Sequence, residues 1–353
     1  MAQITEDLSA LGFRMPAEWE DHTATWLAWP YQTNDWPGKF TAIPWVYCEI
    51  IKNLALSETV RLIVKDSTNI SFVSDTLALA GVNLKQVEFV IAPTNRSWIR
   101  DFGPIFVKDK HHNKGVLDFG FNAWAKYENF SQDDNIPNII ASTRNLSTWQ
   151  PKVNNIRTIL EGGSIDVDGM GTLLTTEECL LSKVQQRNLG FTKSNYEDIF
   201  ARYLGVKKVL WLGTGIEGDD THGHVDDLTR FVAKGKVVTV VEQNKSDVNY
   251  KPLQENLSRL QEMSDADGQK LEVIELPMPS PITFEGVRLP ASYANFYIGN
   301  KVVLVPTFND ANDRLALNIL AQLFPKKNIV GIHCVDLVWG LGTIHCLSQQ
   351  EPC

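Results

Sequence analysis

Cys346, in the segment Gly-Thr-Ile-His-Cys-Leu near the C-terminus, is the side chain in this sequence best suited to nucleophilic chemistry. A thiolate is an intrinsically strong nucleophile, but it forms only where a base or a lowered pKa removes the thiol proton. Cys48, Cys179 and Cys334 are predicted to be small core residues. Cys346 differs because it follows the glycine-containing approach Gly340-Leu-Gly342, where we expect flexibility and sparse apolar packing.

The base that deprotonates Cys346 is expected from a distant part of the chain. His345 is adjacent, but neighbouring side chains of an extended segment point to opposite faces, so His345 is poorly placed. The best alternative is the polar segment 219–227, Asp-Asp-Thr-His-Gly-His-Val-Asp-Asp, which leads directly into an apolar run typical of a strand. If this segment is extended, one of its faces carries Asp220, His222, His224 and Asp226.

Two kinds of chemistry fit that face. His222, His224 and Asp226 form a His-X-His-plus-carboxylate set that can coordinate a divalent metal ion, as in a metal-dependent hydrolase. In the alternative, one histidine is a general acid and base while the carboxylates bind a cation, and neither a metal nor another cofactor is required. The segment alone leaves both interpretations open.

Two further segments place a carboxylate beside a turn. Asp101 belongs to Trp98-Ile-Arg-Asp-Phe-Gly-Pro104, where by itself it would cap a turn or pair with Arg100. Glu161 precedes Gly162-Gly163, and paired glycines allow a close backbone approach, often to a ligand. Each signal is weak when taken alone.

Together these residues predict a cationic substrate. Several carboxylates converging on one site are costly unless a cation neutralises them. A guanidinium is planar, permanently charged and presents pairs of N–H groups that match carboxylates. Such a substrate would neutralise the carboxylates and offer its central carbon to the thiolate. We therefore predict a metal-free hydrolase that acts on a guanidinium group.

The composition restricts the class of protein. With 353 residues, 43% of them hydrophobic, the chain can bury a full core, which argues against a disordered protein. The net charge of −9 and the lack of a basic patch argue against nucleic acid as a partner and weakly favour a cationic substrate. The five cysteines are odd in number and far apart, so we expect no disulfide framework and a reducing cytoplasm.

Targeting signals are also missing from the sequence. The first residues, Met-Ala-Gln-Ile-Thr-Glu-Asp, lack the basic and apolar regions of a secretion signal. No stretch approaches the roughly 18 apolar residues of a membrane span. We therefore expect no membrane association. The oligomeric state stays open, and a homo-oligomer is compatible with the sequence.

Helices and strands alternate along the chain, which predicts an α/β fold. Apolar residues recur at helical spacing in several stretches, and short β-branched runs lie between them. We expect strands at 60–64, 209–212 and 302–305. One helix is expected to begin at Pro44 and a second to run from 196 to 204 with Ser194 as its N-cap. Two more are expected at 251–263 and 311–324.

A weak internal repeat connects these elements with the candidate residues. Asp101, Glu161, His224 and Asn295 each open an apparent hairpin, and Cys346 closes the series at intervals of 60, 63, 71 and 51 residues. A period of this size, repeated about five times, predicts a ring of similar β/α units with these residues near a common axis. The alternative is chance recurrence of hairpins, which are common in α/β chains.

The sequence resembles the agmatine deiminase and bacterial (Porphyromonas-type) peptidylarginine deiminase family of the guanidino-group-modifying, or pentein, superfamily. Any one motif is weak, but their number and order cover nearly the whole chain. The matching segments are Met15-Pro-Ala-Glu-Trp-Glu, Thr25-Trp-Leu-Ala-Trp-Pro30, Trp36-Pro-Gly, Trp98-Ile-Arg-Asp-Phe-Gly-Pro104, Phe121-Asn-Ala-Trp-Ala-Lys-Tyr127, Glu161-Gly-Gly-Ser, Gly223-His-Val-Asp226, Leu289-Pro-Ala-Ser-Tyr-Ala-Asn295 and Ile344-His-Cys-Leu-Ser-Gln-Gln350.

The resemblance implies a single catalytic pentein domain over residues 1–353, in which five ββαβ-like units surround a pseudo-fivefold axis. It implies that Cys346 is the nucleophile and that His224 is the general acid and base. Glu161 is implied to be the carboxylate that lies beside His224 and the substrate. It also implies that Asp101 and Asp226 bind guanidinium nitrogens and that Trp98 forms a wall of the pocket. Asp220 is implied to be an acidic group near the far end of the substrate.

The activity that the resemblance implies is hydrolysis of agmatine to N-carbamoylputrescine and ammonia, without a cofactor, in putrescine biosynthesis. The nearest alternative is a peptidylarginine deiminase, for which Arg100 and Arg288 are the available carboxylate-binding groups. A less favoured alternative is the metal-dependent guanidine hydrolase. Two departures affect the expected pocket: Tyr31 stands where many relatives have His, and Gly340-Leu-Gly-Thr343 replaces a common Gly-Gly-Gly-Asn.

Overall fold

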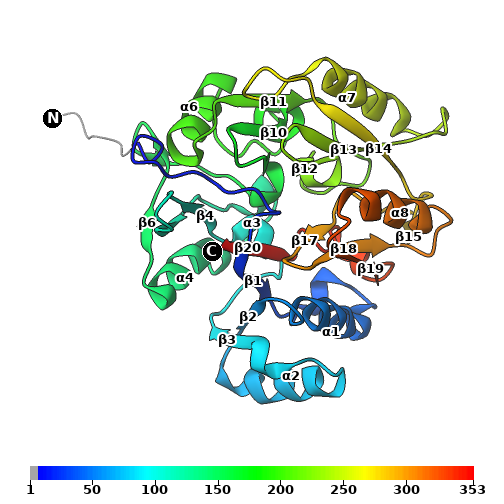
Figure 1. Ribbon diagram of the computed structural model, residues 1–353. Helices are drawn as coiled ribbons and strands as arrows, with labels where there is room; N and C mark the ends of the chain where they lie inside the picture. Colours follow the sequence, from blue (N-terminus) through cyan, green and yellow to red (C-terminus); the bar gives the residue numbers. More distant parts are fainter. Residues whose placement is uncertain (1–6) are drawn as a thin grey trace.

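The structure is a computed structural model that describes residues 7–353. Within these residues, five small sheets surround a common centre (Figure 1). In each sheet an inner strand pairs antiparallel with a middle strand, and the chain then returns through helical structure to an outer strand that is parallel to the middle one. Residues 1–6, which contribute to the prediction that the chain has no secretion signal, lie outside the described residues.

The strands follow this scheme in chain order. The first sheet contains β20 (Ser348–Pro352), β1 (His22–Ala28), β2 (Thr59–Val64) and β3 (Val87–Ile91), and the second contains β4 (Ile105–Lys108), β5 (Lys114–Leu117) and β6 (Ser147–Trp149). The third contains β9 (Asp166–Val167), β10 (Thr172–Thr176) and β11 (Lys208–Leu212), and the fourth β12 (Thr229–Ala233), β13 (Lys236–Val241) and β14 (Glu272–Pro277). The fifth contains β17 (Tyr297–Ile298), β18 (Val302–Thr307) and β19 (Asn328–His333). Two short hairpins stand apart from these sheets, β7 (Lys152–Val153) with β8 (Ile156–Arg157), and β15 (Thr283–Phe284) with β16 (Val287–Arg288).

The longer helices lie at the periphery of the ring, whereas the single-turn helix α3 (Ile99–Phe102) lies near its centre (Figure 1). None of the helices in residues 7–353 combines the length and the apolar character that a membrane crossing requires. The peripheral helices are α1 (Ile43–Leu54), α2 (Ser67–Leu79), α4 (Ile136–Arg144), α6 (Lys193–Leu204), α7 (Tyr250–Glu262) and α8 (Asp313–Leu323), while the five-residue α5 (Glu177–Leu181) directly follows β10.

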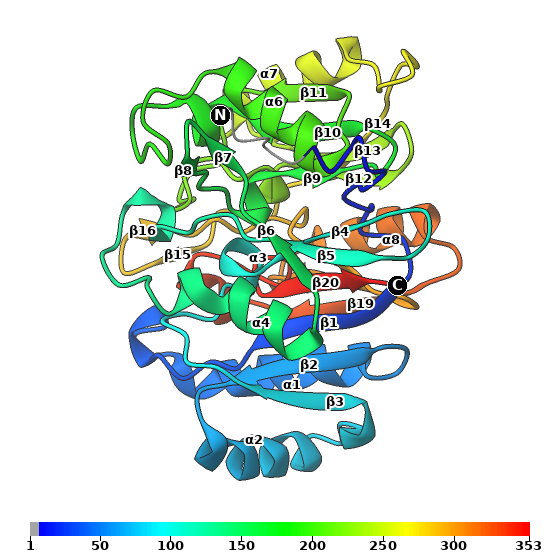
Figure 2. The ribbon, with the colours of Figure 1, turned by 90° about the vertical axis from the view of Figure 1, so that its left-hand side faces the viewer.

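The ring is closed by its two ends. Strand β20, near the C-terminus, pairs antiparallel with β1, near the N-terminus, and Gln350 lies opposite Thr25. Figure 2 shows the red β20 beside the blue β1. Cys346 directly precedes β20, so this closure carries the candidate nucleophile to the centre of the ring.

The five predicted hairpin residues occupy equivalent places in the five units. Asp101 lies in α3 before β4, Glu161 precedes β9, and His224 precedes β12. Asn295 precedes β17 and Cys346 precedes β20. The repeat, the α/β class and the five ββαβ-like units predicted from the sequence are therefore confirmed.

The predicted elements are also present, with helix ends shifted by one to three residues and one corrected N-cap. The expected strands lie within β2, β11 and β18, and the other expected helices are α1, α7 and α8. Helix α6 is capped by Thr192 rather than Ser194, because Thr192 and Asn195 form a reciprocal capping box. All five cysteines are free, as expected.

Candidate active site

Cys346 lines a cavity of about 520 Å³, within the usual range for small-molecule pockets. The cavity also exposes Trp98 and Asp101, two of the predicted site residues, while Asp220 contributes another part of the lining. Cys346 is itself only 4% exposed, so a small molecule would be largely removed from water when it reaches the thiol.

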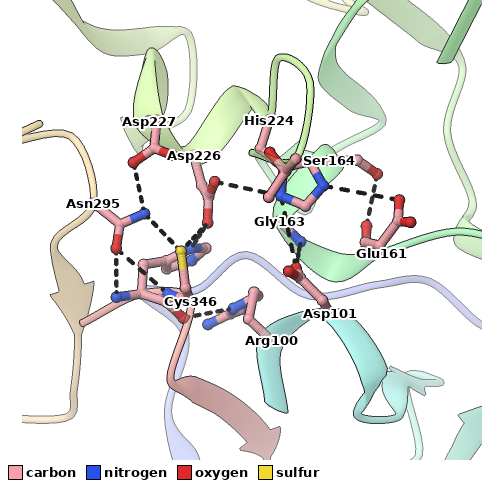
Figure 3. Close-up of polar contacts among 12 residues, drawn as sticks. Arg100, Asp101, Glu161, Gly163, Ser164, His224, Asp226, Asp227, Asn295 and Cys346 are labelled. Atoms are coloured by element: carbon pink, nitrogen blue, oxygen red, sulfur yellow. Dashed lines mark hydrogen bonds and ion pairs between the residues drawn. The ribbon is translucent and has the colours of Figure 1, made fainter. Parts of the chain in front are cut away.

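The predicted carboxylates and histidine converge beside this thiol (Figure 3). His224 Nδ1 lies 3.7 Å from Asp101 Oδ1 and 4.0 Å from Asp226 Oδ1, while its Nε2 lies 3.8 Å from Glu161 Oε2. Asp226 Oδ2 lies 3.8 Å from Cys346 Sγ. Four of the five hairpin units therefore supply these groups, and all five side chains are buried.

Several polar atoms at this point have no hydrogen-bond partner among residues 7–353. They are both ring nitrogens of His224, Glu161 Oε2 and Asp226 Oδ1. A buried polar atom without a partner is costly, and such atoms are concentrated where proteins bind or react with a ligand. Two of them are carboxylate oxygens, which match the N–H groups of a guanidinium.

Gly163 allows this convergence. A Cβ atom on Gly163 would lie 2.6 Å from His224 Nδ1, 2.8 Å from Asp101 Oδ1 and 3.0 Å from Asp226 Oδ2. The paired glycines were expected to admit a ligand, but Gly163 instead makes room for the reacting side chains. Gly342 has the same function beside the thiol, since its Cβ would lie 2.9 Å from Trp98 and 3.2 Å from Cys346 Sγ.

The charges around His224 favour its protonated form. Burial lowers the pKa of His224, but Asp101 and Glu161 more than offset this and hold it well above the ordinary value. Burial likewise opposes ionisation of Glu161, yet Arg187, whose Nε lies 2.9 Å from Glu161 Oε1, holds the pKa of that carboxyl at about 2. Burial raises the pKa of Asp101 to about 6. His224 is therefore suited to donate a proton.

The surroundings of Cys346 favour its neutral thiol over the thiolate. Burial, and then the charges of Asp226, Asp227 and Asp101, raise the pKa of the thiol well above its ordinary value. A bound cation would neutralise those charges and favour the thiolate. The site therefore keeps its nucleophile protonated until a cationic substrate is present.

Replacing Asp226 with Asn is expected to have opposite effects on the thiol and on turnover. Removal of the charge lowers the pKa of Cys346, so iodoacetamide should alkylate the free enzyme faster at neutral pH. Guanidine turnover should fall by about 10²-fold or more, because a group that binds the reacting cation is lost. Peptide mass analysis of the alkylated site and an ammonia assay measure the two effects, and a variant that lost both reactivities would contradict this electrostatic account.

His345 has both ring nitrogens engaged by carboxylates rather than by the thiol. Its Nδ1 lies 2.6 Å from Asp226 Oδ2 and its Nε2 lies 2.8 Å from Glu18 Oε2. Glu18 also pairs with Arg230 and Arg100, so His345 connects Asp226 to a buried ionic network. Apart from the presence of Glu18 in one of the family motifs, no sequence pattern indicated this network.

The expected extended face in segment 219–227 is wrong. His222 and Gly223 have positive φ values of 64° and 92°, and residues 225–227 form a short 3-10 helix. The strict alternation of side chains therefore fails here. His222 turns toward Ser182 and Glu178, whereas His224 turns into the buried site. The structure does not bring His222, His224 and Asp226 together as a metal site.

Cys179 was predicted to be a core residue, and it is buried in a hydrophobic cluster that includes Tyr196 and Phe200. Its thiol nevertheless belongs to the site's surroundings, because ligand atoms of Cys179, His224 and Glu161 lie within 4.8 Å of one another. This group is the one within residues 7–353 that could hold a metal ion. Glu161 is already paired with Arg187, which supplies a positive charge there.

Asp220 lines the cavity, but it is engaged by other side chains. Lys126 forms an ion pair with Asp220, and the Tyr127 hydroxyl donates to Asp220 Oδ2 at 2.8 Å. Asp35 also lines the cavity, and its Oδ2 is buried with no hydrogen-bond partner in the part of the chain that the structure describes. Burial raises the pKa of Asp35 to about 6. Asp35 was not singled out from the sequence.

Comparison with known proteins agrees with this arrangement. Residues 14–352 match the model of the Porphyromonas-type peptidyl-arginine deiminase family. The chain therefore belongs to this family. A relative from Legionella pneumophila (strain Paris), provisionally named as an agmatine deiminase, is 36% identical over 343 residues, which cover 97% of this chain and 96% of the relative.

Solved structures give the same result. The agmatine deiminase of Enterococcus faecalis has a TM-score of 0.90 and 33% identity, with 99% of this chain and 98% of that chain covered. A cysteine-to-serine variant of C. jejuni agmatine deiminase with substrate bound has a TM-score of 0.85 and 29% identity, with 96% of both chains covered. The pentein fold predicted from the resemblance is confirmed.

Proposed function

We propose that this protein is an agmatine deiminase, which hydrolyses agmatine to N-carbamoylputrescine and ammonia in putrescine biosynthesis. The observation that carries the proposal is the convergence of a buried thiol, a buried histidine and three carboxylates, of which Cys346 and Asp101 line one small cavity. The names of the relatives, which are similar over nearly the whole chain, support agmatine as the substrate.

The first half of the reaction releases ammonia and forms a covalent intermediate on Cys346. Asp101 and Asp226 bind the guanidinium, whose charge favours loss of the Cys346 thiol proton to water, and this leaves the thiolate. The sulfur adds to the guanidinium carbon and forms a tetrahedral adduct. His224 then donates a proton to the departing nitrogen, the C–N bond breaks, and ammonia leaves a covalent thiouronium on Cys346.

The second half returns the enzyme to its starting state. His224, now neutral, takes a proton from water as the water oxygen attacks the thiouronium carbon. The C–S bond breaks with its electron pair returning to sulfur, the hydroxyl of the adduct loses its proton as the ureido C=O forms, and the ureido product leaves. That proton balances the one that the thiol lost at the start, so Cys346 is again a thiol and His224 is again protonated. Glu161, held ionised by Arg187, remains beside His224 and stabilises its protonated form through both halves.

The residues available for the far end of the substrate favour an amine over a carboxylate. Arg100 is bonded to Glu18, Gln350 and the His345 carbonyl, and Arg288 is paired with Asp247 at 2.8 Å. Neither of these two predicted arginines is therefore free to bind a substrate carboxylate. Arg96 lines the cavity, but it donates to Asn129 and stacks on Trp124 and Tyr127. Peptidylarginine is therefore the second candidate.

A parallel assay decides between these substrates. Purified enzyme is given agmatine, free arginine or a peptidyl-arginine, and ureido product is measured, with and without a chelator. We expect kcat/KM for agmatine to exceed that for the other two by at least about 10²-fold, since a mismatched or unpaired charge in a buried pocket costs several kcal/mol. The chelator should have no effect. Preference for the peptide would reassign the substrate, and loss of activity with the chelator would restore the metal-dependent alternative.

The cellular setting proposed with this activity is the cytoplasm. The free cysteines are compatible with a reducing compartment. We propose a small cationic guanidine as the partner, rather than nucleic acid or a membrane, because the chain has a net charge of −9.

A further inference from the structure

Asn295 was singled out from the sequence only as the start of a hairpin, yet its side chain touches the reacting sulfur. The residue is fully buried and precedes β17. Its Nδ2 lies 3.1 Å from Cys346 Sγ and 3.0 Å from Asp227 Oδ1 (Figure 3). An amide nitrogen carries two hydrogens, so it can donate to both partners at once.

The orientation of this amide is fixed from its other end. Asn295 Oδ1 accepts hydrogen bonds from the Thr343 hydroxyl at 2.8 Å, from His345 N at 3.0 Å and from Cys346 N at 3.4 Å. A rotated amide would direct N–H groups at these donors and an oxygen at Asp227. The nitrogen must therefore face the sulfur. Thr343, one of the departures from the family pattern, contributes to this constraint.

We propose that Asn295 is a catalytic residue whose Nδ2–H donates to the Cys346 sulfur and stabilises the thiolate during attack and during release of the product. This inference rests on the proposed function, in which Cys346 is the nucleophile. It assigns to the fifth unit of the ring a direct part in the reaction, beside the groups from the other four.

The surroundings of the sulfur show why such a donor is needed. Burial, then Asp226 and Asp227 from the short helix before β12 and Asp101 from α3, raise the pKa of the thiol, whereas the hydrogen bond from Asn295 lowers it. A bond to an ionised acceptor is about twice as strong as one to a neutral acceptor. The bond is therefore strongest when the sulfur is a thiolate and weaker in the covalent thiouronium. It favours the thiolate both before the C–S bond forms and after that bond breaks.

The test measures alkylation of Cys346 by iodoacetamide across pH in the wild type, Asn295→Asp and Asn295→Ala. Asn295→Asp keeps the shape and the accepting oxygen but replaces the donor with an oxygen. Asn295→Ala removes the donor without adding a charge, and it decides the matter if the first variant does not fold. Asn256→Asp is the matched control, because Asn256 is an equally buried amide that binds Gly213 N and Thr214 O outside the site.

In both Asn295 variants, we expect iodoacetamide to alkylate Cys346 at least about tenfold more slowly at neutral pH. This is the effect of raising the pKa of the Cys346 thiol by about one unit. The deficit should shrink as pH rises and the thiol ionises in every protein. Turnover should fall by about 10²-fold. The Asn256 control should keep the wild-type alkylation profile.

Other outcomes would overturn the inference or the function beneath it. If the Asn295 variants lose turnover but are alkylated at the wild-type rate, or are slower by the same factor at every pH, Asn295 has only a structural role. Unchanged turnover in both variants would also overturn it. If iodoacetamide inactivates the wild type without modifying Cys346, the proposed function fails instead.

Discussion

Cys346→Ser is expected to lower the turnover of agmatine by at least about 10⁴-fold, the scale on which other hydrolases lose activity when their nucleophile is removed. The serine hydroxyl has a much higher pKa than a thiol, and the carboxylates that already raise the pKa of Cys346 would oppose its ionisation further. The side chains that bind the guanidinium remain in place. The variant should therefore still bind agmatine while releasing no ammonia.

Three measurements check this expectation: ammonia release, calorimetric binding of agmatine, and intact-protein mass after rapid quenching of the reaction. The wild type should show a covalent adduct and the variant none. Cys353→Ser is the matched control, because Cys353 is exposed at the end of the chain, and it should retain full activity. Undiminished ammonia release from Cys346→Ser would disprove the thiol mechanism.

His224→Gln is expected to reduce turnover by about 10²- to 10⁴-fold, the usual contribution of a general acid and base. Asp101 and Glu161 raise the pKa of His224, so in the free enzyme the imidazole keeps its proton through neutral pH and loses it only as pH rises through that raised value. Glutamine cannot protonate the departing nitrogen. Ammonia release should therefore be lost even in a single turnover, and the tetrahedral adduct should return to substrate.

His222→Gln distinguishes this role from a general effect of the segment. His222 is two positions away in the sequence, but it contacts Ser182 and Glu178 rather than the buried site. We expect that variant to keep the wild-type kcat and KM. Equal losses in the two variants would contradict the assignment and favour a site that uses both histidines. Single-turnover ammonia release and steady-state kinetics provide the comparison.

The sequence by itself determined the fold and most of the chemical groups. The helical and β-branched periodicities indicated an α/β chain, and the spacing of Asp101, Glu161, His224 and Cys346 indicated repeated units around an axis. Both inferences succeed because they depend on local patterns that each unit repeats. The glycine-flanked setting of Cys346, together with the carboxylates, likewise indicated a thiol site for a cation.

Only the tertiary structure decided how these groups face one another. Local backbone dihedrals separate His222 from His224, because the left-handed residues 222 and 223 break the alternation that an extended segment would have. The contacts of Glu18 with His345, of Cys179 with His224, and of Asn295 with Cys346 join distant segments of the chain. No local pattern encodes such contacts, because they exist only after the five units have packed around their common centre.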